Sequence, residues 1–450
     1  MLSFLRSVER VAESGDRQEK TETASEADGH GISASARFGH GFGGERRHGW
    51  AGQAGPRSAV RHGLVRRRRA LTVAELFTHY RISLLVGWCV GGGMKAIAVE
   101  RGEDKPVVIE KPRPEPDAGE ALVRTLRVGV DGTDHEVIAG GHGGFPEGED
   151  HLVLGHEAVG VVVDPNDTEL EEGDIVVPTV RRPPASGTNE YFEENQPDMA
   201  PDGMYAERGI VGAHGFMSEY FTSPSDYLVR IPRSQAELGF LIEPISITEK
   251  AREHAYASRS AFDWNPSSAL VLGNGSLGLL TLAMLRADDK GYEDLYCLGR
   301  RDRPDPTIDI IEKLGATYVD SRETPVEEIP GAHEDMDFIY EATGFPKHAI
   351  QSVQALAPNG VAALLGVPSD WEFEVDAGAF HREMVLHNKA LVGSVNSHVK
   401  HFEAATVTFT KLPRWFLRDL VTGVHPLSEF EAAFEDDDTT IKTAIEFGTV

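Results

Sequence analysis

One segment constrains the fold of this chain more than any other. An apolar strand pattern at 269–272 runs into Gly273-x-Gly275-x-x-Gly278, and a helical pattern over 277–285 leaves the loop. Similar patterns alternate after it, with strands at 295–298, 338–340 and 361–366 and helices at 305–314 and 347–356. Strands joined by helices in this rhythm form a parallel sheet with crossover helices. We therefore predict an α/β domain over residues 249–391.

The glycine loop predicts a dinucleotide site made of Gly273, Asn274, Gly275, Ser276, Leu277 and Gly278. The first glycine permits the tight turn, the second lets the backbone approach a pyrophosphate, and the third lets the helix pack on the strand. The free N–H groups and the dipole of the helix N-terminus favour phosphate. A glycine-rich turn without a ligand is the alternative, and the surrounding strand–helix pattern favours binding.

The end of the second strand indicates which dinucleotide is bound. The strand ends at Gly299, and Arg300 and Arg301 follow it. An NAD enzyme usually has an acidic residue here for the ribose 2′-hydroxyl, whereas an arginine can bind a 2′-phosphate through two hydrogen bonds. Two solvated surface arginines are the alternative. The pattern favours NADP over NAD, and Asp302 leaves some use of NAD open.

Residues 94–248 have a different pattern, of short β-rich segments separated by proline and glycine. The segments are 95–100, 120–128, 158–164, 175–178, 219–222 and 227–231, with a polar loop at 181–205. They predict a compact β domain. Residues 235–256 then have helical spacing, with Pro244 as a break between two helices.

The α/β rhythm ends near residue 392. Helical patterns at 399–409 and 414–421 follow, and then a strand pattern at 442–447. We expect residues 392–450 to return to the β domain.

Four residues are candidate metal ligands: Asp131, His156, Glu157 and Glu243. His156 and Glu157 follow an apolar segment and a glycine turn, and Asp131 lies in a turn about 25 residues upstream. Catalytic zinc takes histidine nitrogen and carboxylate oxygen, usually as three protein ligands plus a water. Glu243 lies in an apolar segment, where its carboxylate needs a partner that a metal would supply. A structural histidine, and a buried glutamate paired with a basic residue, are the alternatives.

With these motifs in this order, residues 94–450 resemble the zinc-dependent medium-chain dehydrogenases, in particular the archaeal glucose dehydrogenases and most closely the halophilic ones. The resemblance implies an α/β protein with a GroES-like, β-rich catalytic domain and a Rossmann cofactor domain with a doubly wound parallel sheet. The catalytic domain would comprise 94–248 and 392–450, and the cofactor domain 249–391.

The resemblance also implies one catalytic zinc, with Asp131 in the place where most relatives have cysteine. His156, Glu157 and Glu243 complete the ligand set, and Glu157 binds the ion directly at some stages or through water. Many relatives carry a second, structural zinc on four cysteines. The corresponding lobe at 181–205 contains no cysteine, so we expect no structural zinc.

The implied reaction is oxidation of D-glucose at C1 to gluconolactone, with hydride transfer to NADP. Thr133 would lie by the reacting hydroxyl, and the proton would leave through bound water or a relay that involves Thr133 or His135. The residues implied to bind the sugar are Thr133, Glu207, Glu243 and Asn396. Two segments would flank the nicotinamide, namely Leu365-Gly366-Val367 and Ser394-Val395-Asn396.

Two other functions stay open at the level of sequence. A polyol or secondary-alcohol dehydrogenase would use the same machinery with another pocket, and Glu207 and Asn396 favour a sugar. A non-catalytic dinucleotide-binding protein would lack the metal ligands. The presence of Asp131, His156 and Glu157 argues against this last class.

The charge of the chain indicates which classes of partner are not expected. The net charge is −28, but residues 1–93 hold 14 basic and 9 acidic residues, so 30 basic and 63 acidic residues lie in 94–450. So acidic a surface repels nucleic acid and anionic membranes, and neither is expected as a partner. It is typical of proteins that work in molar salt, which screens their self-repulsion. An ordinary acidic enzyme is the alternative.

Residues 1–93 show no sustained helical or strand period. Four arginines at 66–69 precede an apolar run at 82–90, which is too short to span a bilayer. We expect this segment to be a disordered extension or the product of a mis-set start codon, with Met94 as the true start. The two cysteines, Cys89 and Cys297, give no disulfide framework and fit a cytoplasmic protein. The resemblance leaves a homodimer or a homotetramer open.

Overall fold

The computed structural model describes residues 92–450, apart from residues 290, 369–370, 436 and 438. The predictions for residues 1–91, including the arginines at 66–69, the apolar run at 82–90 and Cys89, lie outside the described residues. Within the described part, no helix is both long enough and apolar enough to cross a membrane.

A six-stranded parallel sheet follows the glycine loop, as the strand–helix alternation predicts. Its strand order is β14-β13-β12-β15-β16-β17, and every neighbouring pair is parallel. The strands are β12 (Ser268–Leu272), β13 (Asp294–Gly299), β14 (Thr317–Asp320), β15 (Met336–Glu341), β16 (Leu356–Leu364) and β17 (Ala390–Gly393). This is the order of a doubly wound dinucleotide-binding fold, so the Rossmann prediction is confirmed.

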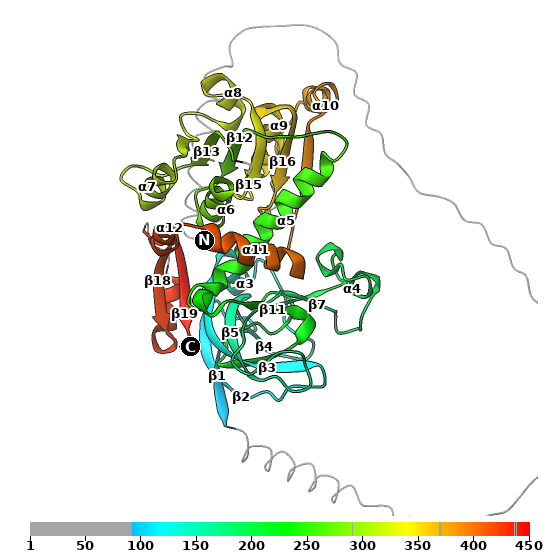
Figure 1. The fold of residues 1–450 in the computed structure, drawn as a ribbon, viewed down its shortest axis with the longest axis vertical. Coiled ribbons are helices and arrows are strands. Elements are labelled where there is room, and N and C mark those ends of the chain that lie inside the picture. The colour runs from blue at the N-terminus through cyan, green and yellow to red at the C-terminus, as the bar shows by residue number, and fades with distance from the viewer. Residues whose placement is uncertain (1–91, 290, 369–370, 436, 438) are drawn as a thin grey trace, which may run out of the picture. The chain divides into compact units, whose positions relative to one another are not determined.

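Helices cover this parallel sheet. Figure 1 shows α6, α9 and α10 beside its strands. The helices after the loop are α6 (Ser276–Ala287), α7 (Pro306–Lys313), α8 (Ile329–Ala332), α9 (Pro346–Ala355) and α10 (Ala377–Leu386). All five residues of β12 are buried. Burial on both faces explains the continuous apolar run in the sequence, because helices exclude water from either side of the sheet.

The β-rich part forms three further sheets. The largest has the order β11-β6-β5-β3-β19-β18, and β10 also pairs with β3; a second sheet is β2-β1-β4, and a third is β7-β8-β9. The strands are β1 (Gly93–Glu100), β2 (Pro106–Pro112), β3 (Glu120–Val130), β4 (His151–Val153), β5 (Glu157–Asp164), β6 (Ile175–Pro178), β7 (Arg181–Arg182), β8 (Ala206–Arg208), β9 (Gly212–Ala213), β10 (Tyr220–Pro224), β11 (Leu228–Ile231), β18 (Val421–Pro426) and β19 (Lys442–Glu446). The predicted β domain is therefore present.

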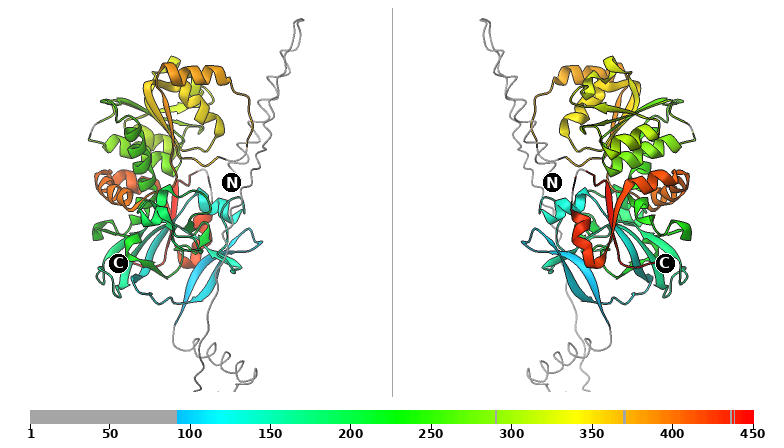
Figure 2. Two further views of the ribbon diagram at one scale, coloured as in Figure 1. Left: turned by 90° about the vertical axis from the view of Figure 1, so that its right-hand side faces the viewer. Right: turned by 90° about the vertical axis from the view of Figure 1, so that its left-hand side faces the viewer.

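The C-terminal segment returns to the β-rich part, as expected. β19 pairs with β3 in antiparallel register, and β18 pairs with β19. Figure 2 shows these strands, in red, beside the cyan strands from the other end of the described chain. Between β17 and β18 lie α11 (Val399–Lys411) and α12 (Arg414–Leu420). The pairing matters for the site, since it places the start of β19 beside the end of β3, which in turn pairs with the start of β5.

One local prediction is wrong. Pro244 does not break two helices; it lies in the first turn of α5 (Ile242–Ser258), after short 3-10 turns at Arg233–Gln235 and Gly239–Leu241. A proline is tolerated in the first turn because the N–H it lacks would have no partner within the helix. The remaining short helices are α3 (Gly132–Ile138) and α4 (Glu190–Glu193).

Candidate active site

Asp131 caps a short helix at the end of β3. Its Oδ1 accepts hydrogen bonds from the backbone N–H groups of Thr133 and Asp134, at 2.9 and 3.2 Å. Asp134 accepts in return from the N–H of Asp131, which completes a capping box. The cap fixes the carboxylate and leaves Oδ2 facing His156 Nε2 at 3.6 Å. The hydroxyl of Thr133 donates to the same Oδ2 at 3.3 Å.

A glycine turn delivers His156 to this carboxylate. Gly155 has φ +85°, and a Cβ there would lie 2.5 Å from Cγ of Met217, so only glycine fits. The N–H of Gly155 donates to Asp134 Oδ1 at 3.2 Å, which ties the turn to α3. The motif predicted from sequence is therefore a rigid junction between the strand ends of β3 and β5.

Glu157 and Lys442 form a buried ion pair next to His156. Nζ of Lys442 lies 2.5 Å from Oε2 of Glu157, and both side chains are almost fully buried. Gly129 makes the pair feasible, because a Cβ at this position would lie 2.1 Å from Oε2 of Glu157. Sequence reasoning missed Lys442. The signal available was weak: a lysine at the start of the short C-terminal strand β19.

The Asp131 cluster, defined as Asp131, His156 and Glu157, brings one ligand atom from each residue within 4.8 Å of the others. At metal–ligand distances of about 2.1 Å, two ligands of a tetrahedral zinc lie roughly 3.4 Å apart. The 3.6 Å between Asp131 Oδ2 and His156 Nε2 fits this spacing. Nδ1 of the buried His156 has no hydrogen-bond partner among the described residues. The residues present thus fit a zinc ion.

The Asp131 cluster places several ionisable side chains close together in a buried environment, and this shifts their pKa values. Burial opposes ionisation of Asp131, but the charge and hydrogen bond of His156 hold the pKa of its carboxyl well below the ordinary value. The same pairing keeps the pKa of His156 well above its ordinary value against the effect of burial. Burial raises the pKa of Glu157 although Lys442 opposes it. A divalent cation would relieve this crowding of carboxylates.

Glu243 lies in the first turn of α5 and is buried. Burial raises its pKa to about 8, and the charges of His156 and Glu157 are close enough to contribute. Its carboxylate makes no hydrogen bond or ion pair with any of the described residues. It is outside the set of ligand atoms that all lie within 4.8 Å. A direct bond from Glu243 to a metal therefore stays a prediction.

Two of the four residues predicted to bind sugar, Glu207 and Asn396, meet at a buried ion pair. Nδ2 of Asn396 donates to Oε1 of Glu207 at 3.2 Å, and Nε of Arg181 donates to the same oxygen at 2.9 Å. Asn396 adopts φ +56°, a left-handed conformation that asparagine tolerates better than most residues. Arg181 was not predicted. It lies in the lobe that the sequence describes only as a polar loop.

The nucleotide loop has the shape that its three glycines predict. Gly273 turns with φ +109°, and a Cβ at Gly278 would lie 1.9 Å from the carbonyl oxygen of Gly273. A Cβ at Gly275 would meet no atom within 4 Å, which leaves this stretch of backbone open. Ser276 and Leu277 form the first turn of α6, whose N-cap is Gly275. The loop is built for close approach by a phosphate group.

Asn274 and Cys297 make contacts that hold the nucleotide loop in place. Nδ2 of Asn274 donates to the hydroxyl of Thr307 at 2.6 Å, which ties the loop to α7. A Cβ at Gly299 would lie 2.6 Å from Oδ1 of Asn274, so glycine at the end of β13 leaves room for this side chain. The thiol of Cys297 faces the Gly273 carbonyl at 3.6 Å, and burial raises its pKa to about 12. This cysteine is therefore a packed thiol.

Arg300 and Arg301 follow β13, as the sequence places them. The N–H of Arg301 donates to the hydroxyl of Tyr318 at 2.8 Å, and its Nε lies 3.9 Å from Asp305 Oδ2. Arg322 lies two residues beyond the end of the neighbouring strand β14 and pairs with Asp302 at 2.7 Å. The acidic residue that left NAD open is thus bound to an arginine.

The segments predicted to flank a nicotinamide lie side by side at the ends of β16 and β17. The N–H of Ser394 donates to the carbonyl of Leu364 at 3.0 Å. The N–H groups of Leu365 and Gly366 both donate to the carbonyl of Glu341. Val367 and Val395 are exposed. The carbonyl of Val395 accepts from the buried Lys250 at 2.9 Å, another residue that sequence reasoning missed.

His135 lies in α3, one turn from Asp131, with its ring edge-on to Phe434. It makes no hydrogen bond or ion pair with the Asp131 cluster in the described part of the chain. Its role in proton transfer stays a prediction.

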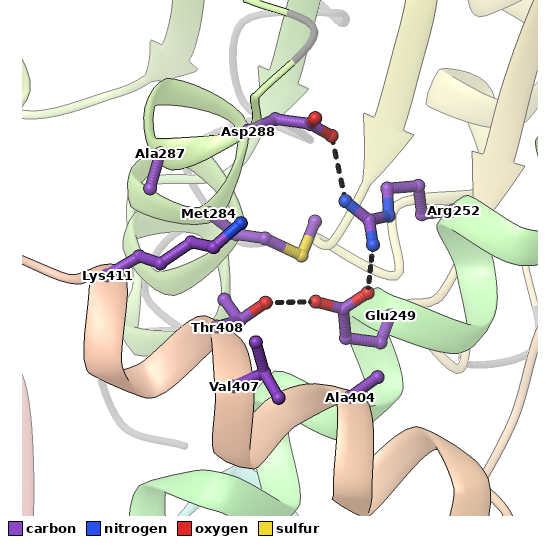
Figure 3. A pocket seen from close by; sticks show the side chains of 9 residues that line it. All are labelled: Glu249, Arg252, Met284, Ala287, Asp288, Ala404, Val407, Thr408 and Lys411. Atoms are coloured by element: carbon purple, nitrogen blue, oxygen red, sulfur yellow. Dashed lines mark hydrogen bonds and ion pairs between the residues drawn. The ribbon is translucent and has the colours of Figure 1, made fainter.

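A cavity of about 230 Å³ between α5, α6 and α11 is separate from these groups. Figure 3 shows that Asp288, Arg252, Glu249 and Thr408 are linked by hydrogen bonds and ion pairs in its wall. Arg252 pairs with Glu249 at 2.7 Å and with Asp288 at 2.8 Å. Thr408 donates to Glu249 in turn. With its polar atoms paired in this way, the cavity does not compete with the Asp131 cluster as the reactive site.

Comparison with known proteins agrees with this geometry. Residues 117–233 match the alcohol dehydrogenase GroES-like domain, and residues 236–447 match the C-terminus of glucose dehydrogenase. The chain is 91% identical over 357 residues to glucose 1-dehydrogenase of Haloferax mediterranei, which covers 79% of this chain and all of that protein. It is 66% identical over 357 residues to the glucose 1-dehydrogenase of Haloarcula marismortui, with the same coverage.

A solved structure extends the comparison to three dimensions. Haloferax mediterranei glucose dehydrogenase in complex with NADP, Zn and gluconolactone is 91% identical, with a TM-score of 0.79. The alignment covers 79% of this chain and 100% of that one. The chain therefore belongs to the zinc-dependent medium-chain dehydrogenase family, in its branch of archaeal glucose 1-dehydrogenases.

Proposed function

We propose that this chain oxidises D-glucose at C1 to gluconolactone and transfers the hydride to NADP, with NAD as a secondary acceptor. The observation that carries the proposal is the 91% identity to a glucose 1-dehydrogenase over that protein's whole length. The solved relative holds NADP, zinc and gluconolactone together, which supports the same substrate and cofactors here. The acidic composition supports activity in molar salt.

The Asp131 cluster is the proposed metal site. Asp131 and His156 would hold the ion, and Glu157 or Glu243 would complete the set directly or through water. Bound zinc supplies Lewis-acid polarisation of the substrate oxygen. The capping box fixes the carboxylate of Asp131, and Gly155 fixes the backbone before His156. These two supports keep the ligand atoms in place before any ion arrives.

The other predicted residues have roles that follow from their contacts. The Thr133 hydroxyl, 3.3 Å from Asp131 Oδ2, is placed to pass a proton between substrate and carboxylate. Arg181 holds Glu207 as a charged acceptor for sugar hydroxyls, and Asn396 adds an amide beside it. An aldose offers several hydroxyl groups, and each must be paired when it leaves water.

We also propose the division of labour that the resemblance implies. Residues 94–248 and 392–450 would carry metal and sugar, and 249–391 would carry NADP. The pairing of β19 with β3 supports assigning the C-terminal segment to the first of these. A cytoplasmic location, which the unpaired Cys297 supports, and a dimer or tetramer are further parts of the proposal.

The test is glucose-dependent reduction of NADP in molar salt, before and after chelation and after zinc is restored. We expect activity to disappear with the chelator and to return with zinc. Activity with a polyol or secondary alcohol but not with glucose, at normal zinc and NADP binding, would contradict the sugar assignment. Full activity in the chelated, zinc-free protein would contradict the metal assignment.

A further inference from the structure

A second group of histidine and carboxylate lies in the β-rich part, around a lysine. The Lys111 cluster comprises Lys111, Glu149, His151 and His214. Nζ of Lys111 lies 2.8 Å from Nε2 of His151 and 3.0 Å from Nε2 of His214. The two imidazole rings stack with centroids 4.9 Å apart. The lysine nitrogen thus occupies the point where the two rings converge.

One backbone contact fixes the proton on His214. The N–H of Val153 lies 3.2 Å from Nδ1 of His214, and a backbone N–H can only donate. Nδ1 therefore carries a lone pair, and the neutral ring has its proton on Nε2. That Nε2–H points at Lys111 Nζ. A charged ammonium has no lone pair to accept it, whereas a neutral amine has one.

The rest of the Lys111 cluster agrees with a neutral amine. An N–H of Lys111 can donate to Nε2 of His151, and Nδ1 of that ring lies 3.5 Å from Oε2 of Glu149. The chain of donors then runs from His214 through Lys111 and His151 to the Glu149 carboxylate. Every nitrogen in it has a complementary partner. The same tautomer argues against a metal ion here, since His214 presents N–H and not a lone pair.

Burial favours the neutral form of each nitrogen base in the Lys111 cluster. Burial lowers the pKa of Lys111, although the charge of Glu149 opposes the shift. Burial also lowers the pKa of His214 to about 4, so this ring is neutral at pH 7. Burial is also the largest cause that lowers the pKa of His151. The charged groups that face the cluster from neighbouring elements are Glu100, Glu149, Asp150 and Arg208.

We propose that Lys111 is an unprotonated, nucleophilic amine at neutral pH and a site of covalent modification by acyl donors, of which an aldonolactone is the natural example. An open cavity of about 520 Å³ gives reagents access, with Lys111 and His151 in its wall. Arg101, Glu100, Glu110 and Asp150 also line it, and such polar groups suit a polyhydroxylated reagent.

The chemical step balances without a further reactant. The lone pair of Nζ attacks the lactone carbonyl carbon, the ring C–O bond breaks, and an amide forms. One proton leaves the nitrogen through His151 and ends on the released ring oxygen as a hydroxyl. The choice of a lactone rests on the proposed function, because glucose oxidation would produce it. The nucleophilicity of Lys111 rests only on the contacts around it.

Competitive labelling tests the nucleophile without reference to catalysis. The intact protein in molar salt is labelled with trace acetic anhydride between pH 6 and 10, and acetylation of each lysine is read by mass spectrometry. The exposed Lys105 is the internal reference. We expect Lys111 to react at least about tenfold faster than Lys105 at pH 7, and its rate to stay nearly flat above pH 7, whereas an ordinary lysine gains about tenfold per pH unit up to its pKa near 10.4.

Two variants and one reagent complete the test. In His214→Gln, an amide oxygen can accept from an ammonium, so the rate at pH 7 should fall about tenfold and regain its pH dependence. Lys111→Arg identifies the labelled peptide and should keep glucose oxidation unchanged. Incubation with δ-gluconolactone should add one gluconoyl group at Lys111.

The outcomes separate the parts of the proposal. A Lys111 rate that climbs with pH as steeply as that of Lys105 would overturn the unprotonated amine. A flat acetylation profile without a lactone adduct would overturn the lactone as reagent. Absence of glucose oxidation in the unmodified wild-type protein would contradict the proposed function, and the acetylation result would still test the nucleophilicity of Lys111.

Discussion

Two clusters in the same β-rich part use the same residue types to opposite ends. The Asp131 cluster and the Lys111 cluster each bring histidine and carboxylate ligand atoms within 4.8 Å of one another. In the first, Lys442 forms an ion pair with Glu157, and Asp131 Oδ2 faces His156 Nε2 at 3.6 Å with no lysine of the described chain between them. In the second, Lys111 fills the centre and bonds both rings. Residue type and proximity therefore do not define a metal site; what defines it is whether polar atoms remain to be satisfied.

The largest expected effect on catalysis comes from removing a ligand from the Asp131 cluster, and removal of a ring from the Lys111 cluster is its control. His156→Ala should lower zinc affinity and kcat/KM for glucose by at least about 100-fold, because loss of even an outer-shell partner of a metal site costs 10–100-fold. His151→Ala, the matched control, should retain one zinc per chain and normal activity. Zinc content after dialysis and glucose-dependent NADP reduction are the readouts. Equal zinc loss in both variants would contradict the assignment of zinc to the Asp131 cluster alone.

Lys442 offers a test of the buried ion pair in the Asp131 cluster. Lys442→Met leaves the Glu157 carboxylate buried without its cation, so the free energy of unfolding of the zinc-free protein should fall by about 3–5 kcal/mol. Lys411 pairs with Asp289 at an exposed position. Lys411→Met should therefore change stability by less than about 1 kcal/mol. Denaturant titration in molar salt measures the free energy of unfolding of both variants. Similar decreases in the two would contradict a special role for the buried Lys442–Glu157 pair.

The nucleotide loop differs from both clusters, because its backbone and not its side chains forms the binding site. Gly278→Ala places a methyl group against the Gly273 carbonyl and should cost more than about 2 kcal/mol of stability. Gly275→Ala meets no protein atom. It should leave stability within about 0.5 kcal/mol and weaken NADP binding about tenfold, or 1.4 kcal/mol. Thermal unfolding and NADP titration separate the effects, and a Gly275→Ala variant with normal NADP affinity would contradict the assigned loop.

The last prediction concerns the choice of cofactor. A hydrogen bond to a charged group contributes about 1.5–3 kcal/mol, so Arg300→Ala should lower kcat/KM for NADP by about 10–100-fold. The value for NAD should change little, since NAD lacks the 2′-phosphate. Steady-state kinetics with both cofactors measure the ratio. An equal decrease for both would mean that this arginine supports the fold of the loop.

The sequence predicted the parts of the molecule that repeat a local pattern. The strands of the parallel sheet are continuous apolar runs, and the glycine spacing follows from backbone geometry, so both could be read without tertiary contacts. Several elements had weaker signals, including β2, with four exposed residues among its seven, and α10, with no buried residue. Pro244 was misread because a proline inside a helical pattern and one in a first turn look alike in sequence.

The site was predicted less completely than the fold. Asp131, His156 and Glu157 were found because each lies at a strand end or turn. Lys442 and Arg181 were missed because their partners, Glu157 and Glu207, lie on other strands, and strand pairing brings them together. Nothing local marks such a lysine or arginine as half of a buried pair. The contact between Asn396 and Glu207 likewise depends on how distant segments pack.

The measurement that tests the central claim most directly is zinc X-ray absorption spectroscopy of the loaded protein in molar salt. The account predicts nitrogen and oxygen neighbours at about 2.0–2.1 Å, with the scattering pattern of one imidazole that disappears in His156→Ala. A sulfur neighbour at about 2.3 Å, or two imidazoles in the first shell, would contradict it. A sulfur neighbour would mean that a cysteine holds the ion. Two imidazoles would mean that the ion lies at the histidines of the Lys111 cluster.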